Sequence, residues 1–374
     1  MNVLHVVNNL SVKSGGQSAA CFDLAYNLSK TSNSVGLLYG DCPGPCFTDE
    51  INPDSNLILF KFDCSNYFDF ISKIMNAINS LKVEIIHLHG MWLPIYAIAF
   101  LLTKLNSLKI VISPHGTLSS WDLNKKKLKK VIALLLYQKA ILNRVDLFLA
   151  TSSSEASGIK ALGLMQPIEI VPIGIQPPSD AILSMRTEVS CGIRVALFLG
   201  RIHPGKGILD LIDAWKLARR LSWRLIIAGA ATTVEEIDYK KQLDKKIIEY
   251  NLTDDIEFLG MVSGEAKCEL FQKTDLFILP TYSENFGIVV AEALSYGIPV
   301  ITTTGAPWED IEINKCGWWI SPGSSSLVLA LEEAMNMNSV ELANMGLRGR
   351  KMVINKYSWD TTCEKLLSAY NSVI

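Results

Sequence analysis

The chain has 374 residues, of which 49% are apolar, 9% are aromatic and 19% are charged. This composition supports a large buried core and excludes an intrinsically disordered chain. The formal net charge of −2 excludes a global attraction to nucleic acid or to an anionic membrane, so any such attraction must be local. At roughly 150 residues per domain, the length predicts two domains.

The eight cysteines are scattered, and only Cys42 and Cys46 lie close together, in a CPGPC turn without histidines at ligand spacing. This usage predicts no zinc site and a reduced, cytosolic chain. The first residues, MNVLHVVNN, lack the basic region and the cleavage site of a signal peptide. The apolar stretch at 91–102 contains Pro94 and is shorter than the ~20 residues that a membrane-spanning helix needs. We therefore expect a soluble, cytoplasmic protein.

Short β-branched runs alternate with helical patterns along almost the whole chain, which is typical of parallel sheets covered by helices. The first series of predicted strands comprises residues 4–7, 35–40, 84–90, 109–116, 146–152 and 168–174. The second series comprises residues 195–200, 224–230, 256–260, 275–281 and 299–304. The fold class is therefore α/β, with one doubly wound domain over 1–175 and another over 190–357.

A polar stretch with several prolines separates the two series around residues 172–192, and it predicts the interdomain linker. The last segment, 358–374, has the pattern of an amphipathic helix. In open α/β sheets, ligands bind beyond the carboxyl ends of the strands. We therefore expect the residues that carry chemistry in the loops that follow the predicted strands.

The loop after the strand at 195–200 carries two cations. Its sequence, GRIHPGKG, matches a P-loop as far as Lys206, but Gly207 stands where a P-loop needs the hydroxyl that holds Mg²⁺. Arg201 and Lys206, at the end of a strand and just before a helix, can neutralise a diphosphate without a metal ion. The alternative is a solvated loop in which the two cations are incidental.

The segment ENFGIVVAEAL at 284–294 carries two carboxylates, Glu284 and Glu292. In one continuous helix they would lie ~12 Å apart along the axis, too far for the paired carboxylates of a retaining glycosidase. We expect Glu284 on a loop and Glu292 inside a helix that begins near Gly287. Such a helix offers free N–H groups to a phosphate, and its carboxylate can accept hydrogen bonds from ribose hydroxyls. Each glutamate by itself can equally be a surface charge.

Glycines and histidines mark the loops of the first domain. Gly15 and Gly16 follow the first strand without forming G-x-G-x-x-G, so they allow either a close approach to a ligand or an ordinary turn. His115, in PHG, follows a strand and is predicted to project into the loop layer, either as a ligand or positioning group or as a structural residue. His87 and His89 share one strand face, but a metal site needs a further ligand that the sequence does not reveal.

The segment NKKKLKK at 124–130 lies between Trp121 and an apolar helical run. A basic segment beside aromatic and aliphatic residues can dock on anionic headgroups or approach a lipid diphosphate. The alternative is a solvated helix face.

Taken together, these motifs resemble glycosyltransferase family 4, a group of retaining, nucleotide-sugar-dependent enzymes with the GT-B fold. The resemblance rests on the ordered combination of the GG loop, PHG, GRIHPGKG and ENFGIVVAEAL, with the family's E-x7-E spacing. It covers nearly the whole chain and is strongest from Arg201 to Thr304. It implies two Rossmann-like doubly wound domains that face each other across a cleft, with the last helix, 358–374, packed back on the first.

The resemblance also implies roles for individual residues. The implied donor-binding residues are Gly15, Gly16, Arg201, Lys206, Glu284, Asn285, Phe286, Gly287, Ile288 and Glu292. The implied catalytic residues are Glu284, His115, Arg201 and Lys206. Arg201 and Lys206 would bind the diphosphate, where charge develops as the glycosidic bond breaks, and His115 would lie near the sugar. The co-substrate would be a UDP- or GDP-sugar, with no other cofactor and no obligatory metal.

The form PHGTLSSWDLNKKKLKK is similar to that of family members that build bacterial surface polysaccharides on lipid-linked acceptors. It implies hexosyl or N-acetylhexosaminyl transfer to a glycan or undecaprenyl-diphosphate-linked acceptor in O-antigen, lipopolysaccharide or exopolysaccharide assembly. The enzyme would then be peripheral on the inner face of the cytoplasmic membrane, through Lys125–Lys130, without a nucleic-acid partner. The alternatives are a nucleotide-sugar epimerase of GT-B fold and a non-catalytic subunit that binds sugar nucleotides.

Overall fold

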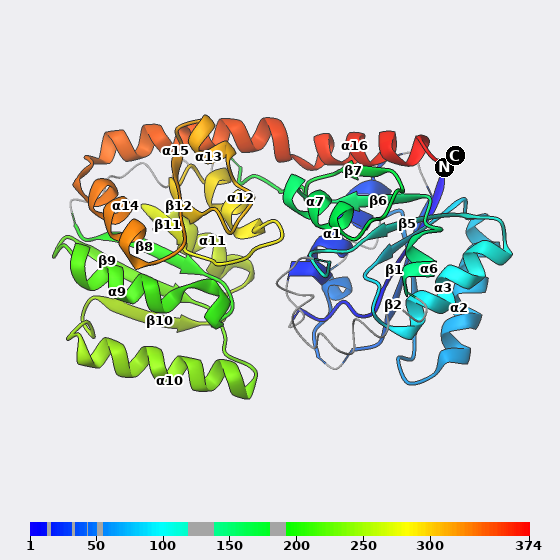
Figure 1. Ribbon diagram of the computed structural model, residues 1–374, viewed down its shortest axis with the longest axis horizontal. Coiled ribbons are helices and arrows are strands. Elements are labelled where there is room, and N and C mark those ends of the chain that lie inside the picture. The colour runs from blue at the N-terminus through cyan, green and yellow to red at the C-terminus, as the bar shows by residue number, and fades with distance from the viewer. Residues whose placement is uncertain (13–15, 32–33, 43, 51–54, 119–137, 180–191) are drawn as a thin grey trace. The chain divides into compact units, whose positions relative to one another are not determined.

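The computed structural model describes all residues except 13–15, 32–33, 43, 51–54, 119–137 and 180–191. The chain divides into two compact units (Figure 1). The N-terminal unit comprises Met1–Gly174 together with Trp359–Ile374, and the C-terminal unit comprises Ile175–Ser358. The predicted class, α/β with two doubly wound Rossmann-like sheets, is confirmed.

The N-terminal unit contains a seven-stranded parallel sheet in the order β3-β2-β1-β4-β5-β6-β7. Its strands are β1 (Asn2–Val7), β2 (Ser34–Gly40), β3 (Leu57–Phe62), β4 (Ile85–His89), β5 (Lys109–Ser113), β6 (Leu147–Ala150) and β7 (Ile168–Ile170). Its helices are α1 (Gly16–Ser29), η2 (Phe47–Glu50), α2 (Tyr67–Leu81), α3 (Pro94–Leu105), α6 (Lys139–Leu142), α7 (Ser153–Ala161) and α16 (Trp359–Asn371).

Helices cover both faces of this sheet. One apolar core joins α2 and α3 to alternate residues of the strands, such as Leu4 and Ile86. The other core joins α1 and α16 to the intervening residues, such as Val3 and Ile85, because successive strand side chains point to opposite faces. The C-terminal helix α16 therefore belongs to the core of the first unit, where Tyr370 is completely buried.

The C-terminal unit contains a six-stranded parallel sheet in the order β10-β9-β8-β11-β12-β13. Its strands are β8 (Arg194–Leu199), β9 (Trp223–Ala228), β10 (Ile256–Gly260), β11 (Leu276–Leu279), β12 (Val300–Thr303) and β13 (Gly317–Ile320). Its helices are η4 (Pro204–Lys206), α9 (Ile208–Ala218), α10 (Val234–Glu249), α11 (Gly264–Gln272), α12 (Ile288–Ser295), α13 (Asp310–Ile313), α14 (Ser324–Asn336) and α15 (Ser339–Tyr357).

Both sheets reverse their strand order beside the first strand of the unit. In the N-terminal unit the reversal lies between β1 and β4, and in the C-terminal unit it lies between β8 and β11. The loops that follow these strands diverge to opposite faces of the sheet, which leaves a crevice at its carboxyl edge. This topology brings the loop at 200–207 next to the loop at 280–287, and these are the loops that carry the predicted diphosphate site.

Two strands were missed by the sequence analysis. β3 is an edge strand whose residues Ile58 and Leu59 are exposed, so it lacks the alternation of a half-buried strand. β13 is also an edge strand, and its four residues, GWWI, are all only partly buried. Neither the middle part of the predicted linker nor the segment at 124–130 lies within the described residues.

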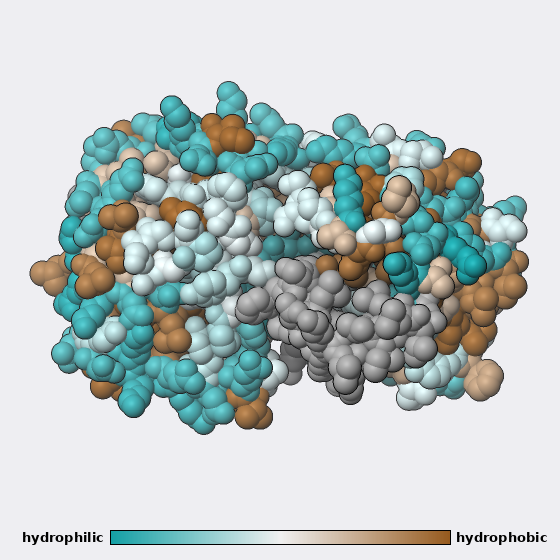
Figure 2. Space-filling view, viewed as in Figure 1, coloured by the Kyte–Doolittle hydropathy of each residue, from teal (hydrophilic) through white to brown (hydrophobic). Residues whose placement is uncertain are grey.

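The prediction of reduced cysteines is wrong at one pair, because the CPGPC turn brings Cys42 and Cys46 together as a disulfide. Five other described cysteines are free. Hydrophilic side chains dominate much of the described surface visible in Figure 2, with apolar side chains between them. Among the described helices, none has the length and apolar character needed to cross a membrane.

A substitution at Gly229 tests the close approach of the loops after β8 and β9. A Cβ at Gly229 would lie 1.8 Å from the carbonyl O of Gly200, so Gly229→Ala forces backbone to move. We expect its free energy of unfolding in urea to fall by about 1–3 kcal/mol. A Cβ at Gly192 would meet nothing within 4 Å, so Gly192→Ala is the matched control and should stay within about 0.5 kcal/mol of wild type. Equal stabilities of the two variants would contradict this packing.

Candidate active site

The loops after β8 and β11 are tied to each other by backbone contacts. Gly207, with φ of +69°, caps α9, and a Cβ at this position would lie 2.0 Å from the carbonyl O of Pro280. The N–H of Tyr282 donates to the carbonyl O of Gly205 at 2.9 Å, and the hydroxyl of Thr281 donates to the same oxygen at 3.1 Å. The glycine at 207 that rules out a P-loop is therefore required here, because only a residue without a side chain allows this approach.

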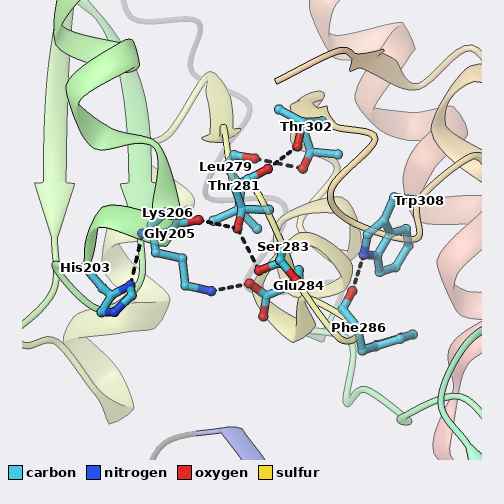
Figure 3. A network of polar contacts seen from close by, with 11 residues as sticks. His203, Gly205, Lys206, Leu279, Thr281, Ser283, Glu284, Phe286, Thr302 and Trp308 are labelled. Carbon is cyan, nitrogen blue, oxygen red and sulfur yellow. Dashed lines mark hydrogen bonds and ion pairs between the residues drawn. The ribbon is translucent and has the colours of Figure 1, made fainter. Parts of the chain in front are cut away.

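Lys206 and Glu284 form an ion pair across these two loops. Lys206 Nζ donates to Glu284 Oε2, and the two side chains are only 18% and 20% exposed. Figure 3 shows the lysine extending from its loop towards the carboxylate. On its own loop, the Gly205 N–H donates to His203 Nδ1 at 3.0 Å, which stabilises the tight turn η4. The structure thus brings together two of the predicted site residues that lie far apart in sequence.

The Glu284 loop is held from the side of β12. The N–H of Glu284 donates to the carbonyl O of Gly305 at 2.8 Å. Trp308 Nε1 donates to the carbonyl O of Phe286 at 2.5 Å, and the two rings pack with their centroids 5.3 Å apart (Figure 3). The Phe286 side chain is therefore part of the core, and a ligand can reach this residue only through its backbone. Asn285 is partly buried in the same loop.

Helix α12 begins directly after this loop, as the sequence predicts. Gly287, with φ of +78°, is its N-cap and supplies no side-chain hydrogen bond, and Ile288 is its first residue. An N-terminus without a side-chain cap leaves N–H groups that can bind an anion. A Cβ at Gly287 would lie 3.1 Å from Glu284 Cγ, so the helix terminus directly adjoins the ion pair.

Glu292 lies inside α12, as expected, and pairs with a residue that the sequence analysis missed. Lys267, on α11, donates to Glu292 Oε1 at 2.6 Å. Glu292 Oε2 is buried and has no hydrogen-bond partner. A buried carboxylate oxygen without a partner is an acceptor for a hydroxyl donor. No sequence signal distinguishes Lys267 from the other lysines, since its role depends on the packing of α11 against α12.

Arg201 does not join the Lys206–Glu284 pair. Its side chain is 68% exposed, and its Nη1 lies 3.7 Å from Glu236 Oε1. Glu236 is buried at the start of α10, where it accepts hydrogen bonds from Thr232 and Thr233. Burial opposes the charge of Glu236, but these hydrogen bonds and Arg201 outweigh it and lower the pKa of its carboxyl. Arg201 thus lies just beyond the carboxyl end of β8, and its partner is Glu236, which the sequence did not reveal.

The described part of the GG loop lies beside the end of β4. Gly16 is the first residue of α1, and Gly15 lies outside the described residues. Gln17 Nε2 donates to the carbonyl O of His89 at 3.0 Å. The loop after β1 and the end of β4 therefore meet at the point where the strand order reverses.

His115 lies at the end of a chain of hydrogen-bonded histidines. His115 Nε2 is 2.9 Å from His89 Nδ1, and His89 Nε2 is 2.9 Å from His5 Nδ1. His87 stands beside this chain and is bonded to Ser113 and Tyr370. Burial lowers the pKa of His5 to about 3 and that of His115 to about 4, and it lowers those of His87 and His89 well below the usual value. All four rings are therefore neutral at pH 7.

The sequence analysis missed His5, although a polar residue inside an otherwise apolar strand was a signal. His5, His87 and His89 place three ring nitrogens within 4.8 Å of one another, a grouping that can in principle hold a metal ion. Sequence spacing does not reveal it, because the third member comes from another strand. The hydrogen bonds that these rings already make decide between a metal site and a hydrogen-bonded network.

Comparisons with known proteins place the chain in a family. The family model described as Glycosyltransferase Family 4 matches residues 14–177, and that described as Glycosyl transferases group 1 matches residues 191–352. The second match contains Lys206, Glu284 and Glu292. Together the two models account for most of the chain.

An uncharacterized glycosyltransferase of Methanocaldococcus jannaschii is 30% identical over 220 residues, which cover 54% of this chain and about half, 53%, of that protein. The GDP-mannose:cellobiosyl-diphosphopolyprenol alpha-mannosyltransferase of Xanthomonas campestris is 24% identical over 311 residues, which cover 81% and 78% of the two chains. The crystal structure of Anabaena HepE with UDP-glucose has a TM-score of 0.79 at 18% identity and covers both chains completely. The chain belongs to the family 4 glycosyltransferases, enzymes of GT-B fold that act with nucleotide sugars.

Proposed function

We propose that the protein transfers a hexosyl or N-acetylhexosaminyl group, with retention of configuration, from a UDP- or GDP-sugar to a lipid-linked glycan. The observation that carries the proposal is the Lys206–Glu284 ion pair. It lies at the carboxyl ends of β8 and β11, beside the N-terminus of α12. A cation and free N–H groups at this point are suited to bind the diphosphate of a donor.

In this ion pair, Lys206 can exchange its partner Glu284 for the diphosphate of the donor. A donor phosphate competes with Glu284 for Lys206, and Glu284 is then able to accept a hydrogen bond from a hydroxyl of the transferred sugar. As the glycosidic bond breaks, negative charge develops on the β-phosphate. Lys206 and the N–H groups at the start of α12 stabilise that charge more in the transition state than in the ground state. This binding mode requires neither a metal ion nor another cofactor.

Glu292 is suited to bind the ribose. Its Oε1 is held by Lys267, while its buried Oε2 lacks a partner and can accept from a ribose hydroxyl. The exposed Arg201 is suited to reach the diphosphate from the end of β8, since the long contact with Glu236 holds it only weakly. The two residues would thus bind different parts of the nucleotide, Glu292 the ribose and Arg201 the diphosphate.

The acceptor that we propose is a glycan on a polyprenyl diphosphate, such as undecaprenyl diphosphate, in surface-polysaccharide assembly. The Xanthomonas relative supports this choice, since its name specifies a diphosphopolyprenol-linked acceptor. Lys125–Lys130 lies outside the described residues, and we propose that it binds anionic headgroups at the inner face of the cytoplasmic membrane.

A donor panel tests the function directly. UDP-, GDP- and ADP-sugars are first ranked by thermal shift, because a ligand that binds only the native state raises the melting temperature. The stabilising donor is then followed by NMR with and without a short polyprenyl-diphosphate-linked sugar. Transfer only with acceptor is expected, and an α-linked donor should give an α-linked product. Epimerisation of the donor alone would indicate an epimerase, and binding without turnover would indicate a non-catalytic subunit.

Lys206→Met should weaken binding of UDP or GDP by roughly 10- to 100-fold, the range for losing one charge-assisted hydrogen bond of about 1.5–3 kcal/mol. Calorimetric titration in EDTA measures the loss in the absence of divalent ions. Lys241→Met is the matched control, because that lysine is 72% exposed and pairs with Asp238 at the surface. Wild-type affinity in Lys206→Met would remove Lys206 from the diphosphate site.

Glu292→Gln should weaken binding of UDP or GDP about 10-fold, since an uncharged amide is a poorer acceptor for a ribose hydroxyl. The 2′,3′-dideoxy analogue of the same nucleotide should bind the variant and the wild type equally, because it lacks the hydroxyls that Glu292 would bind. Glu269→Gln, which changes an exposed carboxylate on α11, serves as the control. An equal loss with both nucleotides would show that Glu292 acts elsewhere than on the ribose.

A further inference from the structure

The buried histidines of the N-terminal unit occupy positions that an apolar core would otherwise fill. His5 lies between Val3 and Val7 on β1, and the register places it opposite His87 on β4. Val3, Val7 and Ile85 belong to the core beneath α1 and α16, so His5 and His87 face the same core by strand alternation. Polar rings at such positions lower stability unless their nitrogens are hydrogen-bonded. Their presence therefore calls for a reason other than packing.

Three of the rings form one continuous hydrogen-bonded chain, His5–His89–His115, which we call the histidine relay. Each link joins one nitrogen of one ring to one nitrogen of the next, at 2.9 Å in both cases. Of the three, His5 and His89 are completely buried and His115 alone is partly exposed. The relay therefore has a closed end at His5 and an open end at His115.

The closed end determines the direction of the hydrogen bonds. Each neutral ring carries one proton, so the protons lie either all on Nδ1 or all on Nε2. In the second case, the buried His5 Nε2 would carry an N–H without an acceptor, since it has no partner in the structure. In the first case, His5 Nε2 is only an acceptor without a partner. Buried N–H donors without partners are rarer in proteins than buried acceptors without partners, which favours the first case. The first arrangement leaves an N–H on Nδ1 of His115.

A metal ion fits these contacts less well. His87 uses both ring nitrogens, with Tyr370 Oη at 2.7 Å and Ser113 Oγ at 2.8 Å, and His89 uses both in the relay. Among the described histidines of this cluster, only His5 Nε2 and the outer nitrogen of His115 remain open. A metal ion would have to displace several of these bonds.

The backbone around His115 is held independently of the relay. His115 has φ of +52°, an uncommon conformation for a residue with a side chain. The next N–H, that of Gly116, donates to Glu155 Oε1 at 2.5 Å, and Glu155 Oε2 accepts from the N–H of Thr151 at 2.7 Å. The carboxylate of Glu155 thereby joins the loop after β5 to the end of β6. Backbone and ring are thus both restrained.

We propose that His5 and His89 are positioning residues that hold His115 with its proton on Nδ1, so that His115 donates a hydrogen bond to a sugar hydroxyl of a substrate. The choice of a sugar hydroxyl as the ligand rests on the proposed function, whereas the position of the proton on Nδ1 does not. Sugar hydroxyls accept as well as donate, and both the donor sugar and the acceptor glycan offer them. A ring fixed in one tautomer binds such a hydroxyl without losing rotational or tautomeric freedom.

The tautomer is measured by NMR on the full chain with ¹⁵N-labelled histidine at pH 7.5, with the His115 signals assigned from His115→Asn. We expect the proton of His115 on Nδ1 in wild type. In His89→Phe, which keeps a ring but removes both nitrogens, His115 should lose this single tautomer. His89→Gln should restore it, because an amide can accept from His5 and donate to His115. His87→Phe is the matched control on the same strand face and should leave the tautomer unchanged.

Transfer rates test the positioning role. His89→Phe should lower kcat by roughly 10- to 100-fold with unchanged affinity for UDP or GDP, and His89→Gln should recover most of the loss. His87→Phe should lose stability, because it removes the hydrogen bonds to Ser113 and Tyr370, but should keep its rate per folded molecule. A purely structural effect is thereby separated from positioning. If His115 binds the donor sugar, the nucleotide sugar should shift the His115 signal. If His115 binds the acceptor glycan, the acceptor alone should shift it.

Several outcomes would overturn the proposal. They are a proton on Nε2 of His115 in wild type, stoichiometric binding of Zn²⁺ that removes the relay signals, or an unchanged kcat in a folded His89→Phe variant. A wild-type protein that shows the Nδ1 tautomer but transfers no sugar from any donor would instead contradict the proposed function and leave the relay intact.

Discussion

Parallel strand pairing is the constraint on which the rest of this structure depends. Within each of the two described sheets all strands are parallel, so each connection must cross from the carboxyl end of one strand to the amino end of the next. The loops that leave the carboxyl ends therefore gather at one edge. Because the strand order reverses beside β1 and β8, the loops on either side of the reversal are free to hold a ligand. Lys206, Glu284 and His115 lie in loops at the carboxyl edge of their own sheet.

The Lys206–Glu284 pair shows how such an edge acquires specific chemistry. Two charges that are only about one-fifth exposed have lost much of their hydration, and their mutual attraction compensates for that loss. A diphosphate, with several charged oxygens, is a natural competitor for the lysine. The glycines at 207 and 287 permit this arrangement, since both have positive φ and both let the loops approach closely. Arg201 and Glu292 have their own partners, Glu236 and Lys267, and do not join the pair.

In the N-terminal unit, the buried histidines are neutral rings rather than a charged pair. An apolar core at these positions would be expected to give equal or greater stability, because a buried polar network gains little net free energy even when it is fully bonded. The network instead fixes the direction of the hydrogen bonds along the relay. It has one closed end, and the single partly exposed ring at the other end, His115, thereby acquires a defined donor. The same burial that keeps the rings neutral makes this direction persistent at physiological pH.

The sequence by itself determined the α/β class, most strands and the strand-end loops, because buried parallel strands are short apolar runs whose boundaries are local. It also identified Lys206, Glu284 and the helix that begins after Gly287, since glycine and charge at strand ends are local signals. Only the tertiary structure decided the partners. Lys206 meets Glu284 rather than joining Arg201, Lys267 holds Glu292, and His5 completes the relay. These choices depend on contacts between residues far apart in the chain, and no periodicity or spacing within one segment encodes them.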